Sequence, residues 1–406
     1  MATVFVHARL IDGTGRDPRD DASVRVDDNR ITGLDVMPHR DDAVVDLQGR
    51  TLMPGIINAH SHLGGVALLQ EDTVPAAVIA AWTFEHCRRA LELGITTCRD
   101  TGGLDGGVPM AISQGIARGP RIIPSGPLIV QLGGHTEFRP EWVMDPCVHH
   151  QGVPGLARFS HVVTGPDEVR AAARLAFKRG AKFLKLCVSG GVTSLTDSLE
   201  DSQLTVEEIS AAVQEARARH TYVTVHTHNN EGIYRGLEAG VECFEHVTAL
   251  DDEAAAAIAE SGAAVVPTLT VAETYRNNAD FLPTEVIDRI AGVKEGMSRA
   301  IKVAHAAGVL VGCGADLIGP NQKDYGLEVA LVADIVGPMQ AIRTATFDNA
   351  RVLRIEHQTG SVQTGKLADL IVVNEDPLDN PRALNDPNRI ALVMKAGAIE
   401  KNILEA

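Results

Sequence analysis

The segment Gly55-Ile56-Ile57-Asn58-Ala59-His60-Ser61-His62 decides the fold class of this chain. Its short apolar run predicts a buried strand, and the two histidines come where that strand ends. Because side chains two residues apart on a strand point to the same side, both imidazoles can face one point. Two unrelated surface histidines after a turn are the alternative, but the buried run before them favours the carboxyl end of a barrel strand, where barrel enzymes hold their active sites.

Seven more strand candidates follow this segment, and amphipathic segments separate most of them. All eight candidates are 55–60, 96–100, 121–123, 182–188, 222–226, 242–246, 264–267 and 309–312. Helices are expected at 166–179, 205–219, 232–239 and 251–261. Each helix opens on a Pro, Thr, Gly or Asp start signal. Glycines expected to cap helix ends are Gly180, Gly240, Gly262 and Gly308. This pattern predicts an α/β fold, a (β/α)8 TIM barrel.

The two ends of the chain lack helical periodicity and read as short strands with turns. The strand candidates there are 3–8, 22–26, 44–47, 365–373 and 390–395. We therefore expect residues 1–55 and 358–406 to form a small composite β-sandwich beside a barrel of residues 56–357.

Composition excludes several classes of function. The 406 residues carry a net charge of −16, which repels nucleic acid and anionic membranes. The six cysteines form no CxxC pair and are expected to be small buried residues in a reducing compartment. No apolar run approaches a membrane span and no signal peptide is recognised. We expect a cytoplasmic homo-oligomer with a small-molecule substrate and no nucleic-acid or membrane partner.

Lys185 lies in the middle of the apolar strand candidate 182–188. A lysine there is costly unless its charge is removed or paired. Carboxylation by CO2 would turn it into an anionic ligand able to bridge two metals. A lysine paired in a salt bridge inside the barrel is the alternative.

His226, His246 and Asp316 are each the first strong ligand type at the end of a later strand. Imidazole and carboxylate suit Zn, Mn and similar divalent ions. One such histidine alone would more often be a structural group. Together with His60, His62 and Lys185, however, they make six candidate ligands at five strand ends in barrel order, which indicates a metal centre.

These motifs resemble the amidohydrolase superfamily, and within it the imidazolonepropionase-like and Xaa-Pro dipeptidase-like branch. The segments that carry the resemblance are 53–62, 133–135, 189–192, 226–228, 231–233, 245–246, 314–316 and 365–370. The likeness spans almost the whole chain. Two positions depart from the family pattern: Asn229-Asn230 stand where a glycine is usual, which predicts an altered pocket wall, and Ala315 replaces the usual threonine.

The resemblance implies a binuclear centre of two divalent ions, with zinc expected, bridged by carboxylated Lys185 and a hydroxide. His60, His62 and Asp316 would hold the more buried ion. His226 and His246 would hold the outer one.

The resemblance also implies catalytic roles. Asp316 would take the proton of the water and pass it to the leaving amine. His135 and His228 are candidates for substrate contact or oxyanion stabilisation, with a structural role as the alternative for each. Further candidates are weaker: Gln131, Arg139 and Tyr234 as substrate contacts, Arg99-Asp100 as a structural ion pair, and His149, His150 and His161 in a loop or lid over 139–163.

The function expected from this set is hydrolysis of an amide bond, in a dipeptide (a dipeptidase or carboxypeptidase activity) or in an N-acyl amino acid. A xenobiotic aryl-amide or carbamate hydrolase is the alternative, followed by hydrolysis of a cyclic imide or imidazolone. Deaminases of the superfamily typically lack the strand-four lysine, so Lys185 argues against deamination. A metal-free scaffold would require broken ligands, whereas all six are present.

Overall fold

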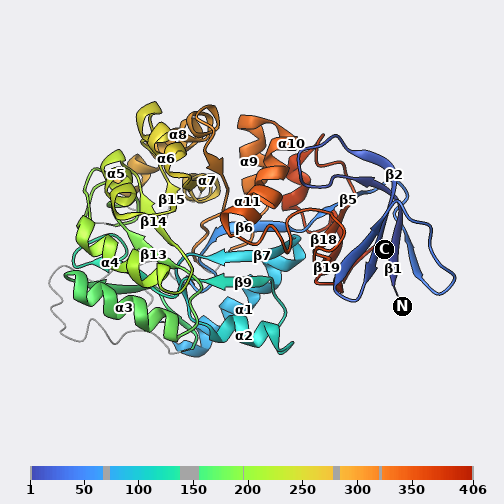
Figure 1. Ribbon diagram of the computed structural model, residues 1–406, viewed down its shortest axis with the longest axis horizontal. Coiled ribbons are helices and arrows are strands. Elements are labelled where there is room, and N and C mark those ends of the chain that lie inside the picture. The colour runs from blue at the N-terminus through green and yellow to red at the C-terminus, as the bar shows by residue number, and fades with distance from the viewer. Residues whose placement is uncertain are drawn as a thin grey trace.

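A computed structural model describes residues 2–66, 74–137, 155–194, 196–277, 284–319 and 322–404. Figure 1 shows a large body of mixed strands and helices, with a sheet that carries both chain ends at one side of it. Arg139, His149 and His150, which the sequence singled out, lie outside the described residues.

Two parallel sheets form the centre of the large body. The smaller has the order β6-β7-β9, with bounds Ile56–Ser61, Ile95–Asp100 and Arg121–Pro124. The larger has the order β12-β10-β13-β14-β15-β16-β17. Its strands span Ser160–Val163, Leu128–Gln131, Leu184–Cys187, Val223–Thr227, Cys243–His246, Ala264–Val266 and Leu310–Val311. A short antiparallel pair joins β8 (Gly103–Leu104) to β11 (Ala157–Arg158).

Backbone hydrogen bonds connect the two sheets on both sides. The Ala59 N–H donates to the Cys313 carbonyl at 3.1 Å, and the Asp316 N–H donates to the His60 carbonyl at 3.0 Å. On the other side, the Lys182 N–H donates to the Pro124 carbonyl at 2.8 Å. The first predicted strand therefore lies beside the last, as in a (β/α)8 arrangement.

All eight predicted strands of the large body are present, but β10 and β12 of the larger sheet and the short pair β8 and β11 were missed. The third predicted strand, β9, ends at Pro124, and the chain turns through Gly126 (φ +73°) before it continues as β10. β12 was also missed, because residues 139–163 were interpreted as a loop. It pairs in parallel with β10 over its whole length.

Helices follow most of the central strands and cover their outer side (Figure 1). They are α1 Ala76–Glu92, α2 Gly107–Ser113, α3 Pro166–Lys178, α4 Val206–Arg217, α5 Asn230–Ala239, α6 Asp252–Ser261, α7 Leu269–Asn277, α8 Thr284–Ala306, α9 Leu327–Val336, α10 Pro338–Arg343 and α11 Asn349–Val352. A π-helical turn spans Thr344–Asp348 and a 3₁₀ turn Pro381–Asn385. The four helices expected from the sequence are confirmed within one or two residues at each end.

Local capping explains where these helices begin and end. Thr205 and Glu208 form a capping box at the start of α4. Gly240 and Gly262 end α5 and α6 in the left-handed conformation, at φ +87° and +74°, as the sequence predicted.

The two terminal segments join in one eight-stranded sheet. Its order is β20-β19-β18-β5-β1-β2-β3, and β4 pairs with β1. The strands are β1 Thr3–Leu10, β2 Arg19–Asp27, β3 Arg30–Leu34, β4 Ala43–Asp46, β5 Thr51–Pro54, β18 Leu370–Val373, β19 Ile390–Lys395 and β20 Ala398–Asn402. Antiparallel pairing of β5 with β18 links the two chain ends. The expected pairing of the ends is thus present, while the two-layer sandwich and the domain boundaries stay predictions.

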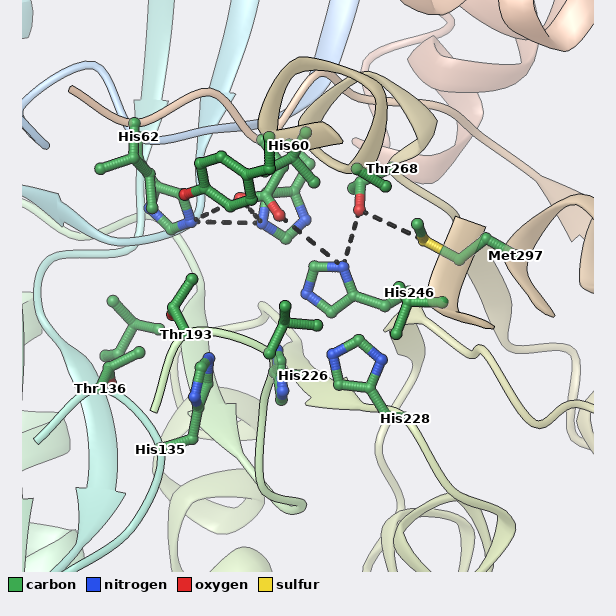
Figure 2. A pocket seen from close by; sticks show the side chains of 18 of the residues that line it. His60, His62, His135, Thr136, Thr193, His226, His228, His246, Thr268 and Met297 are labelled. Carbon is green, nitrogen blue, oxygen red and sulfur yellow. Dashed lines mark hydrogen bonds and ion pairs between the residues drawn. The ribbon is translucent and has the colours of Figure 1, made fainter. Parts of the chain in front are cut away.

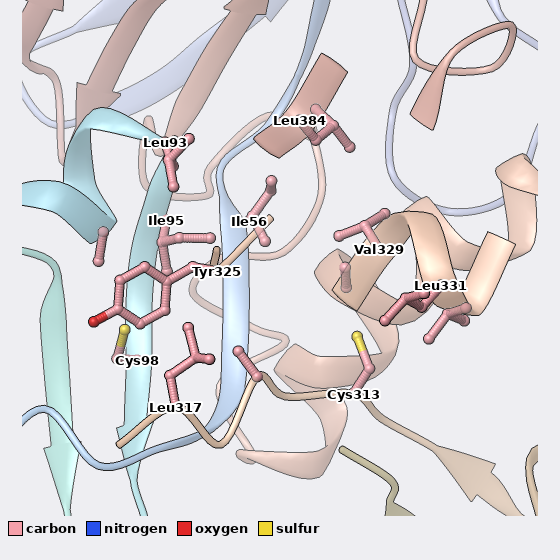
Figure 3. Close-up of a cluster of buried hydrophobic side chains, with 14 of the residues drawn as sticks. Ile56, Leu93, Ile95, Cys98, Cys313, Leu317, Tyr325, Val329, Leu331 and Leu384 are labelled. Atoms are coloured by element: carbon pink, nitrogen blue, oxygen red, sulfur yellow. The ribbon is translucent and has the colours of Figure 1, made fainter. Parts of the chain in front are cut away.

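A buried apolar cluster joins the central strands to the helices beside them (Figure 3). Ile56 and Ile95 project from β6 and β7 toward Val329 on α9 and toward Tyr325 just before it. The Tyr325 hydroxyl donates to Gln322, whose amide donates to the His62 carbonyl at 3.0 Å. This core thereby supports the backbone at the end of β6.

No helix within the described ranges is long and apolar enough to cross a membrane.

Candidate metal centre

All six predicted ligands line one cavity at the carboxyl ends of the central strands (Figure 2). The cavity holds about 660 Å³ of space, including its open mouth. Its described lining comprises His60, His62, Leu128, His135, Thr136, Phe159, Lys185, Val192, Thr193, His226, His228, His246, Thr268, Val271, Ala272, Tyr275, Ile290, Val293, Met297, Asp316 and Ile318. One part is therefore rich in imidazoles, and another, built largely from α7 and α8, is apolar.

His60, His62 and Asp316 converge most closely. The Nε2 atoms of His60 and His62 lie 3.3 Å and 3.1 Å, respectively, from the same carboxylate oxygen of Asp316. The two Nε2 atoms are 3.3 Å apart. Three atoms able to act as ligands thus surround one small volume, as the alternation of the first strand predicted.

Second partners fix which nitrogen of each imidazole faces that volume. His60 Nδ1 lies 2.8 Å from a carboxylate oxygen of Glu245, so it acts as the donor in that bond. His62 Nδ1 donates to the Gly102 carbonyl at 2.9 Å. Both imidazoles are therefore held with the Nε2 lone pair toward Asp316, in the way that outer partners orient metal-bound histidines.

His226 and His246 lie next to this trio. The ring centroid of His246 is 4.9 Å from that of His60 and 4.6 Å from that of His226. His246 Nδ1 is 2.8 Å from the Thr268 hydroxyl oxygen, and His226 Nε2 is 3.2 Å from the Gly190 carbonyl. His60, His246 and Asp316 each offer one ligand atom within 4.8 Å of the others, a spacing that fits a shared metal ion.

Lys185 is the unusual member of the set. Its side chain is only 1% exposed, and its Nζ has no hydrogen-bond partner among the described residues. Burial lowers its pKa, although the charge of Glu245 acts in the opposite direction. The salt-bridge alternative for Lys185 thus finds no partner in the described parts of the chain, and a nitrogen with a lowered pKa is suited to reaction with CO2.

The donor set fits a divalent metal. Burial lowers the pKa of His226 and of His246 well below the ordinary value, so both rings are neutral and their lone pairs are free for a ligand role. Burial opposes ionisation of Asp316, but the neighbouring His60, His62 and His246 together outweigh it and hold the Asp316 pKa well below its usual range. Neutral imidazoles and an ionised carboxylate are the forms that bind zinc.

His135 and His228, the predicted substrate contacts, lie on the same side of the cavity (Figure 2). His135 stacks on His226 with ring centroids 4.2 Å apart, and its Nδ1 lies 2.8 Å from the Ser194 hydroxyl. His228 Nδ1 lies 2.7 Å from the Thr248 hydroxyl. Burial lowers the pKa of His135 to about 3 and that of His228 to about 4, so both are neutral near pH 7.

Two glycines make room for these side chains. A Cβ at Gly191 would lie 2.1 Å from the ring of His135. A Cβ at Gly314 would lie 2.3 Å from the backbone nitrogen of His60. The glycines of 189–192 and 314–316 therefore permit the close approach that the site requires.

Local backbone conformation turns two ligands toward the cavity. His246 and Asp316 have φ values of +68° and +52°. Such angles are unfavourable for residues other than glycine and collect at functional sites. His246 is the last residue of β15, and Asp316 lies in the loop that follows β17. At both positions the conformation redirects the side chain.

The predicted ion pair Arg99-Asp100 is wrong. Arg99 donates to a carboxylate oxygen of Glu245 at 2.6 Å, and both side chains are completely buried. Asp100 instead accepts from the backbone N–H groups of Leu63 and Leu104. Because neighbouring residues on a strand point to opposite faces, the side chains of 99 and 100 could not pair across β7.

Glu245 is a site residue that the sequence analysis did not identify. It contacts His60, Arg99 and the Thr224 hydroxyl beneath the cavity. Burial raises the pKa of Glu245, but Arg99, Lys185 and His60 together outweigh it and lower that pKa, so the carboxylate is charged. An acidic residue two positions after Cys243 in a buried strand was the available signal, because the pleat places both on the interior side.

The departure at Asn229-Asn230 does not alter the pocket wall as predicted. Asn229 caps α5 by accepting from the Gly232 N–H at 2.8 Å. The Asn230 amide donates to Asp251 at 2.7 Å, and neither asparagine lines the cavity.

The weaker candidates also lie elsewhere. The Gln131 side chain accepts from the Leu204 N–H at 2.8 Å. Tyr234 is 37% exposed on α5, and His161 belongs to β12. None of the three is part of the cavity lining.

Similarity to known proteins indicates the family of this chain. The pattern of the amidohydrolase family matches residues 51–399. This chain belongs to the amidohydrolase family. The match spans the central strands, the helices around them and much of the terminal sheet.

Individual relatives indicate which amidohydrolases this chain resembles. Ochratoxinase from Aspergillus niger is 30% identical over 369 residues, covering 86% of this chain and 75% of that protein. A prolidase structure in complex with N-methylphosphonate-L-proline superposes with a TM-score of 0.93 and 31% identity, covering 99% of this chain and 100% of that one. A Xaa-Pro dipeptidase structure with bound methionine gives a TM-score of 0.88 and 30% identity, with coverage of 99% and 100%. These similarities place the chain with the dipeptidase-like amidohydrolases.

Proposed function

We propose that this amidohydrolase is a binuclear metal-dependent enzyme that hydrolyses the amide bond of a dipeptide or an N-acyl amino acid. The observation that carries the proposal is the convergence of ligand atoms of His60, His62 and Asp316 within 3.3 Å of one another. Lys185 lines the same cavity, and its buried Nζ has no partner in the described parts of the chain. We also propose that the metal is zinc, that a carboxylated Lys185 bridges the two ions, and that the strands close into a barrel around the site.

Each ligand has a position consistent with its proposed task. His60, His62 and Asp316 would hold one ion, and His226 with His246 would hold the second. When bound, the metal pair would activate a water molecule and polarise the scissile carbonyl. Asp316 is the one carboxylate in the described lining, so it is the group that would accept the proton of the water and return it to the leaving amine.

Substrate binding would depend on neutral donors. Lys185 is the only lysine or arginine in the described cavity lining, and carboxylation would remove its positive charge. His135 and His228 are neutral near pH 7 and lie beside the proposed ligands. We propose that they hydrogen-bond the carbonyl oxygen or the carboxylate of the substrate. The prolidase bound to N-methylphosphonate-L-proline, a similar structure, supports a peptide-like substrate.

A second candidate is a hydrolase of bulkier aryl amides or carbamates. Apolar side chains on α7 and α8 form a large part of the lining, including Val271, Ile290, Val293 and Met297. Such a surface favours a large apolar group. The 30% identity to ochratoxinase is consistent with this candidate.

The deciding experiment compares kcat/KM for paired substrates on the zinc-loaded enzyme. One member of each pair is an N-acyl amino acid or dipeptide, and the other carries a neutral C-terminal amide. We expect the free carboxylate to be preferred. Equal or faster hydrolysis of the neutral member would favour the second candidate, and no hydrolysis of either class would contradict both.

A further inference from the structure

Tyr275 stands out among the cavity residues. It lies on α7, the helix that follows β16, and lines the cavity together with Val271 and Ala272 of the same helix. No role follows for it from the metal centre or from the family motifs.

The hydroxyl of Tyr275 is buried and has no hydrogen-bond partner in the described part of the protein. Several other polar groups of the lining have partners: Thr268 bonds to His246, and His135 and His228 bond to serine and threonine hydroxyls. Among the described residues, Lys185 Nζ and Thr136 Oγ1 share the unpartnered state of the Tyr275 hydroxyl, and of these Lys185 is already assigned to the metal centre. A buried hydroxyl without a partner lowers the stability of the folded state, because its hydrogen bond to water is lost and not replaced. Its retention is explained if a ligand supplies the missing acceptor.

The surroundings would make such a bond effective. The described lining near Tyr275 includes the apolar side chains of Ile290, Val293 and Met297. Burial, and next the charge of Asp316, raise the pKa of the Tyr275 hydroxyl, so it stays protonated near pH 7. Tyr275 and Asp316 line the same cavity. A neutral phenol donates a hydrogen bond, and the low local polarity strengthens it.

We propose that the Tyr275 hydroxyl donates a hydrogen bond to an oxygen of the bound substrate, either its carbonyl or its carboxylate. The inference rests on the proposed amide hydrolysis and assigns one binding residue within the same cavity. Tyr275 would then take part in substrate recognition. Among the described lining residues, it is the one hydrogen-bond donor that α7 contributes through its side chain.

Replacement of Tyr275 by phenylalanine tests the proposal, because two measurements should change in different directions. The free protein should unfold at the same temperature or higher, since the variant removes a hydroxyl that has no partner among the described residues. At the same time kcat/KM should fall roughly 3- to 10-fold, as for the loss of one hydrogen bond. Calorimetric titration of zinc-loaded protein with N-acetyl-L-phenylalanine should show a similar loss of affinity.

Tyr234→Phe is the matched control. Tyr234 is partly exposed on α5 and does not line the cavity, so its hydroxyl should be dispensable for both measurements. A lower unfolding temperature for Tyr275→Phe with unchanged kcat/KM would overturn the proposal, because the hydroxyl would then have a structural partner. Equal loss in the control would overturn it too.

The calorimetric result separates this inference from the proposed function. If the wild-type protein hydrolyses no amide but binds N-acetyl-L-phenylalanine more tightly than Tyr275→Phe, the proposed function fails and the binding role stands. Equal affinities of the two proteins, or no binding by the wild type, would overturn the role of Tyr275.

Discussion

At the scale of single residues, substitution of Lys185 distinguishes a metal-binding role of this lysine from a purely structural one. Its buried Nζ has no partner among the described residues, and burial lowers its pKa. Lys185→Met should therefore leave the free energy of unfolding of the metal-free protein unchanged or raise it, while it reduces metal content. Urea unfolding and elemental analysis measure the two effects. A strongly destabilised variant that keeps its metal would favour the structural salt bridge.

Asp316 should be needed for turnover more than for the fold. Asp316→Asn retains an oxygen that can act as a ligand, but an amide cannot accept the proton of the water. We expect kcat to fall by about 10²- to 10⁴-fold, with most of the metal retained. Steady-state kinetics with metal analysis of the same sample checks this, and a near-normal kcat would contradict the assignment.

Glu245 should control the orientation of His60. Glu245→Gln weakens the acceptor that holds His60 Nδ1 and leaves buried Arg99 without its charged partner. Loss of such an outer partner typically lowers metal affinity 10- to 100-fold, and an unpaired buried charge costs about 3–5 kcal/mol of stability. Competition with a chelator and urea unfolding measure these changes. Unchanged metal affinity would show that His60 is oriented by other contacts.

Most of the proposed ligands could be predicted from sequence because they lie at or just beyond the ends of strands, and parallel strands end at the same edge. Lys185 could be predicted because a lysine within an apolar strand is unusual. The outer partners could not be predicted. Glu245 reaches His60 across 185 positions of sequence, and the Arg99 guanidinium reaches it from β7. Such contacts depend on the packing of several strands, which periodicity alone does not give.

At the scale of elements, α7 depends on an acidic residue from another helix. The Glu328 carboxylate on α9 accepts from the Leu269 N–H at 3.1 Å and from the Thr270 N–H and hydroxyl at 2.7 Å each. It thus satisfies backbone donors at the start of α7, the helix that carries Tyr275. Glu328→Gln should lower the free energy of unfolding by roughly 1–3 kcal/mol, because one amide group would face these donors. Stability equal to the wild type would show that α7 is held by its apolar contacts alone.

Elements with local signals were predictable, and those without them were not. Thr205, Gly240 and Gly262 mark helix ends through interactions within a few residues. β12 has no such mark. Its four residues are stabilised by pairing with β10, which is distant in sequence.

For the whole molecule, the buried imidazoles predict acid sensitivity of the metal-free protein. The folded-state pKa values of His135 and His228 are about 3 and 4, below the ordinary 6.5. As pH falls through 6.5, the unfolded state takes up protons first, so the stability of the folded state decreases until the folded-state values are reached. For His228 alone the loss approaches about 3 kcal/mol near pH 4. Glu328 acts in the opposite sense, because burial raises its pKa to about 7 and the folded state gains that proton first.

Urea unfolding of the metal-free protein from pH 8 to pH 4 measures this balance. The raised pKa values of Asp100 and Asp197 act in the same sense as that of Glu328. We expect a net loss of stability, since four imidazoles of the cavity have lowered pKa values, two of them well below the ordinary value. The His228→Gln variant should show a smaller loss over the same range. Stability that is independent of pH would contradict the assigned environment of these histidines.

We propose that six side chains from five strands, or from the loops that follow them, hold two divalent ions. Elemental analysis of the protein, purified without chelator and quantified per chain, measures this number. We expect two divalent ions per wild-type chain and fewer after Lys185→Met. Absence of stoichiometric metal in the wild-type protein would contradict the metal centre, and a single ion would contradict its binuclear form.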